Sequence, residues 1–332
     1  MTTPAPSESS LEEREPLVDR AAVTAAHAVI SKHIHRTPLL TSRSLSERAG
    51  VSVYLKPECL QKAGSFKARG AFHRALTLPA EVRSRGLLTY SSGNHGQAVS
   101  LVAKTLGLAA TIVMPEDAPA IKRAACLGYG ARVELAGFTS DDRKARAETL
   151  EAEQGLAMIQ PFDDPAIIAG QGTVGLELLE QAPEPITTVL VPIGGGGLVS
   201  GVLAALRPDL RVIGVEPEAA NGMQASLAAG ERTPVQPGPT IADGLKPVRP
   251  GVRNFRHAVA LGLEVVTVTD AEIRAAMRLL FERARLVVEP SGAATVAALC
   301  SGRVALAGPV ACVISGGNVD PAVFAQVLTE DA

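Results

Sequence analysis

The sequence lacks an excess of charge of either sign. Its 332 residues include 32 Lys and Arg and 34 Asp and Glu, which gives a formal net charge of -2, and the basic side chains form no continuous run. Proteins that bind nucleic acids depend on clustered basic side chains that neutralise phosphates. The near balance of positive and negative side chains therefore argues against nucleic acid as a partner.

Long apolar segments are missing as well. No apolar stretch reaches the roughly 18 residues that a membrane-spanning helix needs, and residues 1–16 show no positive segment followed by an apolar one, as a secretory signal would. These residues also offer few apolar side chains to offset the entropy of ordering, so they are predicted to form a flexible tail. We expect a cytoplasmic enzyme with no membrane partner.

Cysteine is scarce, and no two cysteines are close in sequence. The chain has four, Cys59, Cys126, Cys300 and Cys312, and none of them forms a CxxC pair. This spacing argues against a sequence-local zinc site or redox motif. We expect reduced thiols, most of them buried.

The remaining pattern is that of an α/β protein. Short β-branched segments alternate with helical segments of roughly 10 to 15 residues, which predicts βα units and parallel sheets. Nine strands are predicted, at residues 53–56, 87–90, 110–115, 132–135, 157–160, 187–193, 211–217, 264–269 and 310–315. Nine strands would crowd one sheet, so we predict two open twisted sheets flanked by helices. We assign residues 17–85 and 156–332 to a large domain and residues 86–155 to a small one.

Four glycines in a row follow the predicted strand at 187–193. Gly194, Gly195, Gly196 and Gly197 leave consecutive backbone N–H groups open at a helix N-terminus, an arrangement typical of anion binding. A Walker A loop is excluded because no lysine follows. A dinucleotide fingerprint is excluded because its last glycine is replaced by Val199 or Ser200, depending on the register. The loop is predicted to hold a phosphate that belongs to neither class of nucleotide.

Three other strand ends carry small polar residues. In open α/β sheets ligands bind beyond the carboxyl ends of the strands. "SSGNHG" (91–96) offers amides, hydroxyls and an imidazole that could grip a carboxylate, and "SGGN" (315–318) adds a neutral hydroxyl. In "GSFKARGAF" (64–72), Lys67 falls in the first turn of a predicted helix, where the helix dipole disfavours a positive charge. A lysine with a lowered pKa is a nucleophile toward carbonyls, so this amine and the phosphate loop point to a Schiff base with pyridoxal phosphate.

Six stretches together resemble the fold-type II pyridoxal phosphate enzymes, in the branch of threonine and serine dehydratases and serine racemase. In chain order they are "GSFKARGAF", "SSGNHGQAVS", "PIGGGGLVSG", "TIADGLK" (240–246), "EPSGAA" (289–294) and "SGGN". The resemblance runs from about Thr37 to Asp320. It implies a fold like that of the tryptophan synthase β subunit, with the large domain binding the cofactor and the small domain carrying the substrate loop.

The resemblance also implies roles for single residues. Lys67 would carry the cofactor and take the α-proton, and Ser92 would lie on the opposite face of the ring as a second catalytic group. The implied cofactor contacts are Phe66 and Gly244 on the ring faces, Gly194 to Gly197 on the phosphate, Asn94 on the ring hydroxyl, Ser315 at the ring nitrogen, and Glu289 in the rest of the pocket. The implied carboxylate site is Ser91, Ser92, Gly93, Asn94 and His95.

This similarity predicts β-elimination of a β-hydroxy amino acid such as L-threonine or L-serine to a 2-oxo acid and ammonia. Serine or hydroxyaspartate racemisation is the first alternative. A dehydratase specialised for 3-hydroxyaspartate or another β-substituted amino acid is a further alternative, as are a β-replacement synthase and a non-catalytic binding protein. Arg143, in "FTSDDRKA", could meet an acidic substrate, but its charged surroundings favour a solvated helix arginine.

The resemblance carries weaker implications for metal binding and assembly. Metal-dependent members of this branch have a glutamate after "GV" and a second carboxylate six residues later. Here Glu216 occupies the first place and Gly222 the second, which leaves one possible carboxylate ligand and argues against a tight divalent site. The chain ends soon after "SGGN", so no regulatory domain is expected. We expect the protein to form a homodimer or a homotetramer.

Overall fold

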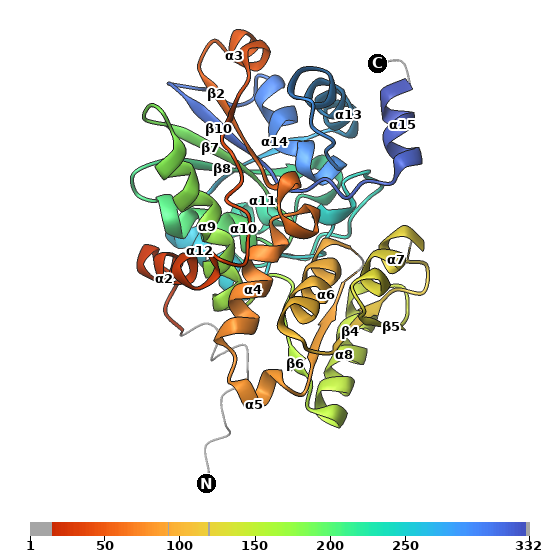
Figure 1. Cartoon of the computed structure of the whole chain (residues 1–332). Helices are drawn as coiled ribbons and strands as arrows, with labels where there is room; N and C mark the ends of the chain where they lie inside the picture. Colours follow the sequence, from red (N-terminus) through yellow and green to blue (C-terminus); the bar gives the residue numbers. More distant parts are fainter. Residues whose placement is uncertain (1–14, 92, 119, 330–332) are drawn as a thin grey trace.

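The computed structural model describes residues 15–91, 93–118 and 120–329, which form two sheets flanked by helices (Figure 1). The larger sheet has the strand order β1-β2-β10-β7-β8-β9, and the smaller sheet has the order β5-β4-β3-β6. This confirms the predicted fold class. All but the last two residues of the predicted tail lie outside the described residues.

All nine predicted strands are present. The larger sheet contains β1 (Leu40–Thr41), β2 (Val53–Pro57), β7 (Thr188–Pro192), β8 (Arg211–Pro217), β9 (Glu264–Val268) and β10 (Val310–Ile314). The smaller sheet contains β3 (Leu87–Tyr90), β4 (Ala110–Met114), β5 (Arg132–Leu135) and β6 (Ala157–Met158). Every pairing is parallel except that of β1 with β2. The sequence pattern missed β1, because two residues are too short to show a period.

The smaller sheet extends beyond the predicted end of its domain. Strand β6 pairs with β3, Leu87 opposite Ala157 and Leu88 opposite Met158. The boundary predicted at residue 155 therefore separates this strand from its sheet. We extend the smaller lobe to residue 158.

The helices follow the strands and cover both faces of each sheet (Figure 1). They are α2 (Arg20–Ile30), α3 (Arg43–Ala49), α4 (Lys67–Thr77), α5 (Ala80–Arg83), α6 (Asn94–Leu106), α7 (Ala120–Gly128), α8 (Ser140–Gln154), α9 (Pro165–Gln181), α10 (Gly197–Leu206), α11 (Gly222–Ala229), α12 (Val252–Ala260), α13 (Asp270–Leu279), α14 (Pro290–Cys300) and α15 (Pro321–Thr329). Short single turns include η1 (Glu58–Leu60), η2 (Lys62–Gly64), η3 (Glu218–Ala220), η4 (Asp243–Leu245) and the π-helical η5 (Leu280–Ala284). No described helix is long and apolar enough to cross a membrane.

The core is divided by the larger sheet into two apolar layers. Strand β7 is buried on both faces, so Val189 and Val191 join the layer under α2, α9 and α10, whereas Leu190 joins the layer under α13 and α14. Side chains alternate between the faces of a strand, which explains why one continuous apolar run serves both layers. The described cysteines are all free, with Cys126 and Cys312 buried, Cys59 partly buried and Cys300 exposed.

A group of four buried ionic side chains joins β2, η1, α4 and α9. Lys56, Glu58, Arg69 and Glu177 are each 0% exposed, and their formal charges cancel. Arg69 donates to both oxygens of Glu58 at 2.8 and 2.7 Å and to both oxygens of Glu177 at 2.7 and 2.9 Å. Its fifth N–H is directed to Thr173 Oγ1 at 3.1 Å, so the five guanidinium donors are all used.

The lysine of this ionic cluster is equally well satisfied. Lys56 Nζ donates to Glu177 Oε2 at 2.6 Å, to the Thr37 carbonyl at 2.8 Å and to Gln181 Oε1 at 2.8 Å. Breaking a buried ion pair by removing one partner leaves an uncompensated charge, which is strongly destabilising. The ionic cluster therefore fixes the position of α4, whose first residue is Lys67.

We predict that Glu177→Gln lowers the free energy of unfolding by about 3 to 5 kcal/mol, because Arg69 and Lys56 would then lack half of their counter-charge in the core. Glu180→Gln on the same helix is the matched control. Glu180 forms an exposed ion pair with Arg36 at 3.0 Å, worth about 0 to 1 kcal/mol. Urea denaturation of both variants measures the difference, and equal effects would contradict the proposed importance of the cluster.

Candidate active site

Lys67 lies where α4 begins, against the end of β10. The amide of the preceding residue, Phe66, donates to the Ser315 carbonyl at 3.1 Å, and Ser65 forms a bridge with Gly316. The Lys67 side chain is partly buried, and its Nζ donates to the Pro161 carbonyl at 2.6 Å and lies 5.2 Å from the centre of the Phe66 ring. Burial lowers the pKa of this amine to about 8.

The four-glycine loop connects β7 to α10 and has no space for side chains. A Cβ on Gly194 would lie 2.8 Å from the Gly244 carbonyl, and one on Gly197 would lie 3.0 Å from the Phe162 carbonyl. Gly196 has φ +100°, a left-handed conformation that favours glycine. Among the residues that the structure describes, none accepts from the amides of Gly194, Gly195 or Gly196. These free N–H groups and the α10 N-terminus suit an anion.

Two adjacent residues connect the lysine to the glycine loop. The Pro161 carbonyl accepts the Lys67 amine, and the Phe162 ring occupies the space that a Cβ on Gly195 would need. Sequence reasoning missed both residues. Their only local signal was their position just after the predicted strand at 157–160, at the carboxyl edge where ligands bind.

Asn94 is held in one orientation by residues from the larger lobe. Its Nδ2 donates to Glu289 Oε1 at 2.6 Å, and its Oδ1 accepts from Asn318 Nδ2 at 2.9 Å. Asn318 Nδ2 also donates to the Ala63 carbonyl at 2.8 Å, which identifies it as the donor. The second N–H of Asn94 remains available to a ligand. Asn318 was part of a quoted motif, but its role in orienting Asn94 was not predicted.

Glu289 immediately precedes α14 and is 5% exposed. Burial, reinforced by the nearby charge of Asp243, raises the pKa of its carboxyl to about 8. The Glu289 amide donates to the Gly316 carbonyl, and the side chain would clash with any Cβ at residue 316. Glu289 therefore lies between the "SGGN" turn and Asn94, and it is neutral over most of the physiological pH range.

Gly244 lies beside the glycine loop, and Ser315 lies beside Phe66. The Gly244 amide donates to Ser291 Oγ at 3.0 Å, and the Gly244 carbonyl lies against Gly194. Ser315 follows β10, is buried, and contacts Phe66 through its carbonyl. Ser291 was not among the predicted site residues, although it lies within "EPSGAA".

The "SSGNHG" segment begins at the end of β3 and enters α6. Ser91 Oγ accepts from the Gly93 amide at 3.1 Å, and Ser92 lies outside the described residues. The His95 ring is buried, and its Nε2 lies 3.0 Å from the Ile159 carbonyl. Because that carbonyl can only accept, Nε2 carries the proton. Burial and the nearby Lys67 amine lower the pKa of His95 to about 3, so the ring is neutral.

Glu216 acts as a cap for α11. Its two oxygens accept from the amides of Met223 at 2.8 Å and Gln224 at 2.9 Å, and burial raises its pKa to about 7. Over the described ranges, no group of three or more His, Cys, Asp and Glu side chains could hold a metal ion. Divalent cations prefer several hard oxygen ligands, whereas both Glu216 oxygens accept from backbone amides.

The prediction that Arg143 is a solvated arginine is wrong. It is 9% exposed, donates to Ser140 Oγ at 2.9 Å and to the Phe138 carbonyl at 3.4 Å, and has a buried Nε with no partner among the described residues. It interacts electrostatically with Asp117 and Asp142 and, less strongly, with Tyr90, the last residue of β3 before Ser91. The charged pattern of α8 hid this burial, because the helix is exposed on most of its other positions.

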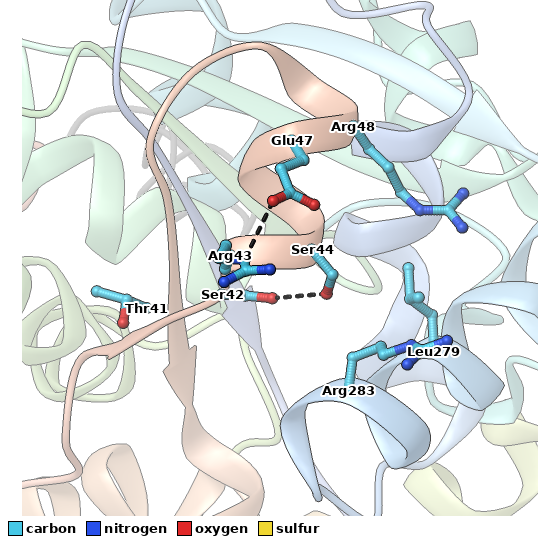
Figure 2. A pocket seen from close by; sticks show the side chains of 8 residues that line it. All are labelled: Thr41, Ser42, Arg43, Ser44, Glu47, Arg48, Leu279 and Arg283. Atoms are coloured by element: carbon cyan, nitrogen blue, oxygen red, sulfur yellow. Dashed lines mark hydrogen bonds and ion pairs between the residues drawn. The ribbon is translucent and has the colours of Figure 1, made fainter.

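A separate cavity of about 630 Å³ lies between α3 and η5 (Figure 2). It is lined by Thr41, Ser42, Arg43, Ser44, Glu47, Arg48, Leu279 and Arg283. Arg43 pairs with Glu47 at 3.1 Å at its rim. None of the predicted catalytic, cofactor-binding or substrate-binding residues lines this cavity. The cavity is therefore separate from the candidate site around Lys67.

Comparison with known proteins identifies the family. Residues 30–316 match the model of a family described as pyridoxal-phosphate dependent enzyme. This chain belongs to that family. The site fits the cofactor, because it combines an amine of lowered pKa with a side-chain-free loop suited to a phosphate.

The relatives of this pyridoxal-phosphate-dependent enzyme include ammonia-lyases and a racemase. The chain is 42% identical over 303 residues to an L-threonine ammonia-lyase of Geobacter sulfurreducens, covering 90% of this chain and 75% of the relative. It is 42% identical over 304 residues to an L-threo-3-hydroxyaspartate ammonia-lyase of Saccharomyces cerevisiae, covering 90% of this chain and 93% of the relative. The solved structure of maize serine racemase superposes with a TM-score of 0.90 at 38% identity, covering 94% of this chain and 97% of the racemase chain.

We predict that Glu289→Gln flattens the pH dependence of stability in the cofactor-free enzyme. The carboxyl titrates near pH 4.5 when unfolded and near 8 when folded, so the unfolded state releases its proton first. The wild type should therefore lose stability, relative to the variant, as pH rises from about 4.5 to 8, by up to a few kcal/mol. Urea denaturation at several pH values measures this. Glu282→Gln, an exposed site in η5, should follow the wild type; identical slopes for all three proteins would contradict the raised pKa.

Proposed function

We propose that this enzyme is an ammonia-lyase that removes the hydroxyl group of a β-hydroxy amino acid, such as L-threonine or L-serine, and releases a 2-oxo acid and ammonia. The observation that carries the proposal is the contact of the Lys67 amine with the segment that packs on the glycine loop. The ammonia-lyases among its relatives support this reaction class. The water lost by elimination is taken up again when the C=N bond of the released imine is hydrolysed to the 2-oxo acid and ammonia.

Each predicted site residue has a place in this proposal. Lys67 would hold the cofactor through Nζ, and the glycine loop would hold its phosphate. Phe66 and Gly244 would lie against its ring, Asn94 would donate its free N–H to the ring hydroxyl, and Ser315 would face the ring nitrogen. Glu289 would orient Asn94. The segment Ser91, Ser92, Gly93, Asn94 and His95 would bind the substrate carboxylate.

When bound, pyridoxal phosphate supplies an electron sink for the pair left behind at the substrate α-carbon. Lys67 takes the α-proton on Nζ, and its pKa, lowered to about 8, leaves about a tenth of the amine unprotonated at pH 7 and more as the pH rises. Ser92, which lies outside the described residues, would be the second acid or base. Ser315 offers a hydroxyl and not a carboxylate, so no fixed negative charge faces the ring nitrogen from that position. Cytoplasmic location and a homodimer or homotetramer stay predictions.

We predict that Lys67→Ala lowers the rate of 2-oxo acid formation from L-threonine and L-serine by at least about 10²- to 10⁴-fold, because a positioned base is lost. Lys62→Ala, in the neighbouring η2, is the control and should keep its activity. Borohydride treatment of the wild type should attach the cofactor to the peptide that contains Lys67. Racemised serine without 2-oxo acid would support the racemase instead, and a cofactor attached elsewhere would overturn the site.

A second candidate substrate is 3-hydroxyaspartate. The yeast relative is named for it, and Arg143 is a buried cation near the end of β3 whose Nε has no partner in the described part of the chain. A second carboxylate on the substrate would give this guanidinium a charge-assisted hydrogen bond, typically worth about 1.5 to 3 kcal/mol.

We predict that Arg143→Met lowers kcat/KM for L-threo-3-hydroxyaspartate about 10- to 100-fold more than for L-threonine, because only the first substrate presents a second carboxylate. Arg146→Met is the matched control, since Arg146 lies on the same helix and pairs with Glu134. Steady-state kinetics with both substrates measure the ratio. An unchanged ratio in Arg143→Met would remove this candidate.

A further inference from the structure

Asn254, on α12, is packed against the glycine loop. It is 0% exposed, and a Cβ on Gly196 would lie 2.7 Å from the Asn254 Cβ. Asn254 Nδ2 donates to the Gly195 carbonyl at 2.9 Å and approaches the Phe162 carbonyl at 3.4 Å. The Gly251 amide, which precedes α12, also donates to the Gly195 carbonyl at 3.0 Å. One loop carbonyl is thus held by two donors from the same helix end.

Holding this carbonyl also orients the next amide. The peptide bond is planar and trans, so the Gly195 carbonyl and the Gly196 N–H point to opposite sides. The carbonyl faces α12, and the N–H of Gly196 therefore faces away from it. Glycine accepts many backbone conformations, so a run of four glycines would not maintain this orientation without support.

We propose that Asn254 is a positioning residue that turns the Gly196 amide toward the cofactor phosphate. The inference rests on the proposed role of the glycine loop. Sequence reasoning did not find Asn254, because its position in the chain is 58 residues beyond the glycine that it orients and no motif connects the two.

The hydrogen bonds of Asn254 favour this role over simple packing. Its Oδ1 is buried and has no partner within the described part of the chain. Rotating the amide would place this oxygen against the carbonyls of Gly195 and Phe162, so the orientation is set by its donors. An unpaired buried acceptor is destabilising. An apolar residue of similar size would fill the same space without burying such an acceptor. The part of Asn254 that the site uses is therefore the Nδ2 group.

The test is the substitution Asn254→Asp, which introduces a side chain of nearly the same shape. Once the introduced carboxyl is ionised, at pH 8 or above, the variant lacks the Nδ2 donor and places a carboxylate against the Gly195 carbonyl, while the Gly251 amide remains in place. We expect the dissociation constant for pyridoxal phosphate to rise about 10- to 100-fold, as loss of a charge-assisted hydrogen bond would cause. At pH near 5 the introduced carboxyl, once protonated, can donate again, so the affinity should approach that of the wild type. The ³¹P resonance of the bound cofactor should shift in the variant at pH 8.

Two further variants make the result specific. Asn254→Ala should weaken cofactor binding at both pH values without recovery, and it provides the measurement if the aspartate variant does not fold. Gln171→Glu is the matched amide-to-acid control. Gln171 is also 0% exposed, and its Nε2 has no partner among the described residues, but it lies on α9 against Gly70. This control should lower stability and leave the cofactor affinity and the ³¹P resonance unchanged.

The ionisable groups around Asn254 are retained in every variant. Among the described residues they include Asp163, which accepts from the Val252 and Arg253 amides, and Arg253, Arg256 and His257 on α12. A pH effect confined to Asn254→Asp is therefore due to residue 254. The inference would be overturned if both Asn254 variants bound pyridoxal phosphate with wild-type affinity. It would also be overturned if Asn254→Asp lost as much affinity as Gln171→Glu and did not regain it at low pH. A wild type that binds no pyridoxal phosphate would instead overturn the proposed function.

Discussion

The site depends on the buried salt bridges that Glu58 and Glu177 form with the guanidinium of Arg69. Arg69 is two residues beyond Lys67 on α4, and its five donors are all used in the core. Figure 1 shows α4 between the larger lobe and α6 of the smaller one. A helix held this firmly at its first turn gives the lysine a defined starting point, which a flexible side chain needs if it is to serve as a base.

The candidate site is built from segments that meet at the carboxyl edges of both sheets. Pro161 and Phe162 connect the lysine to the glycine loop, and Ser315 and Gly316 connect the lysine segment to β10. The contact between Asn94 and Glu289 joins the smaller lobe to the larger one. Each contact uses a backbone group or a short side chain, so the positions of the ligand-binding groups follow from the positions of the helices and strands.

Burial determines the protonation states at this site. It lowers the pKa of Lys67 and raises that of Glu289, in each case to about 8, since desolvation disfavours the charged form of either group. At pH 7 the carboxyl is therefore largely neutral, whereas only about a tenth of the amine is unprotonated. The neutral Glu289 carboxyl therefore adds no negative charge beside an anionic cofactor, which the backbone N–H groups of the glycine loop can hold.

Periodicity in the sequence determined the nine strands, and composition at their ends determined Lys67, the glycine loop and the small polar turns, because these signals are local. Only the tertiary structure decided the short strand β1, the pairing of β6, the burial of Arg143 and the contacts of Asn318 and Asn254. These features depend on contacts between residues far apart in the chain, such as Asn318 with Asn94 and Asn254 with Gly195. Such contacts leave no periodic trace in sequence, so they become visible only when the chain is folded.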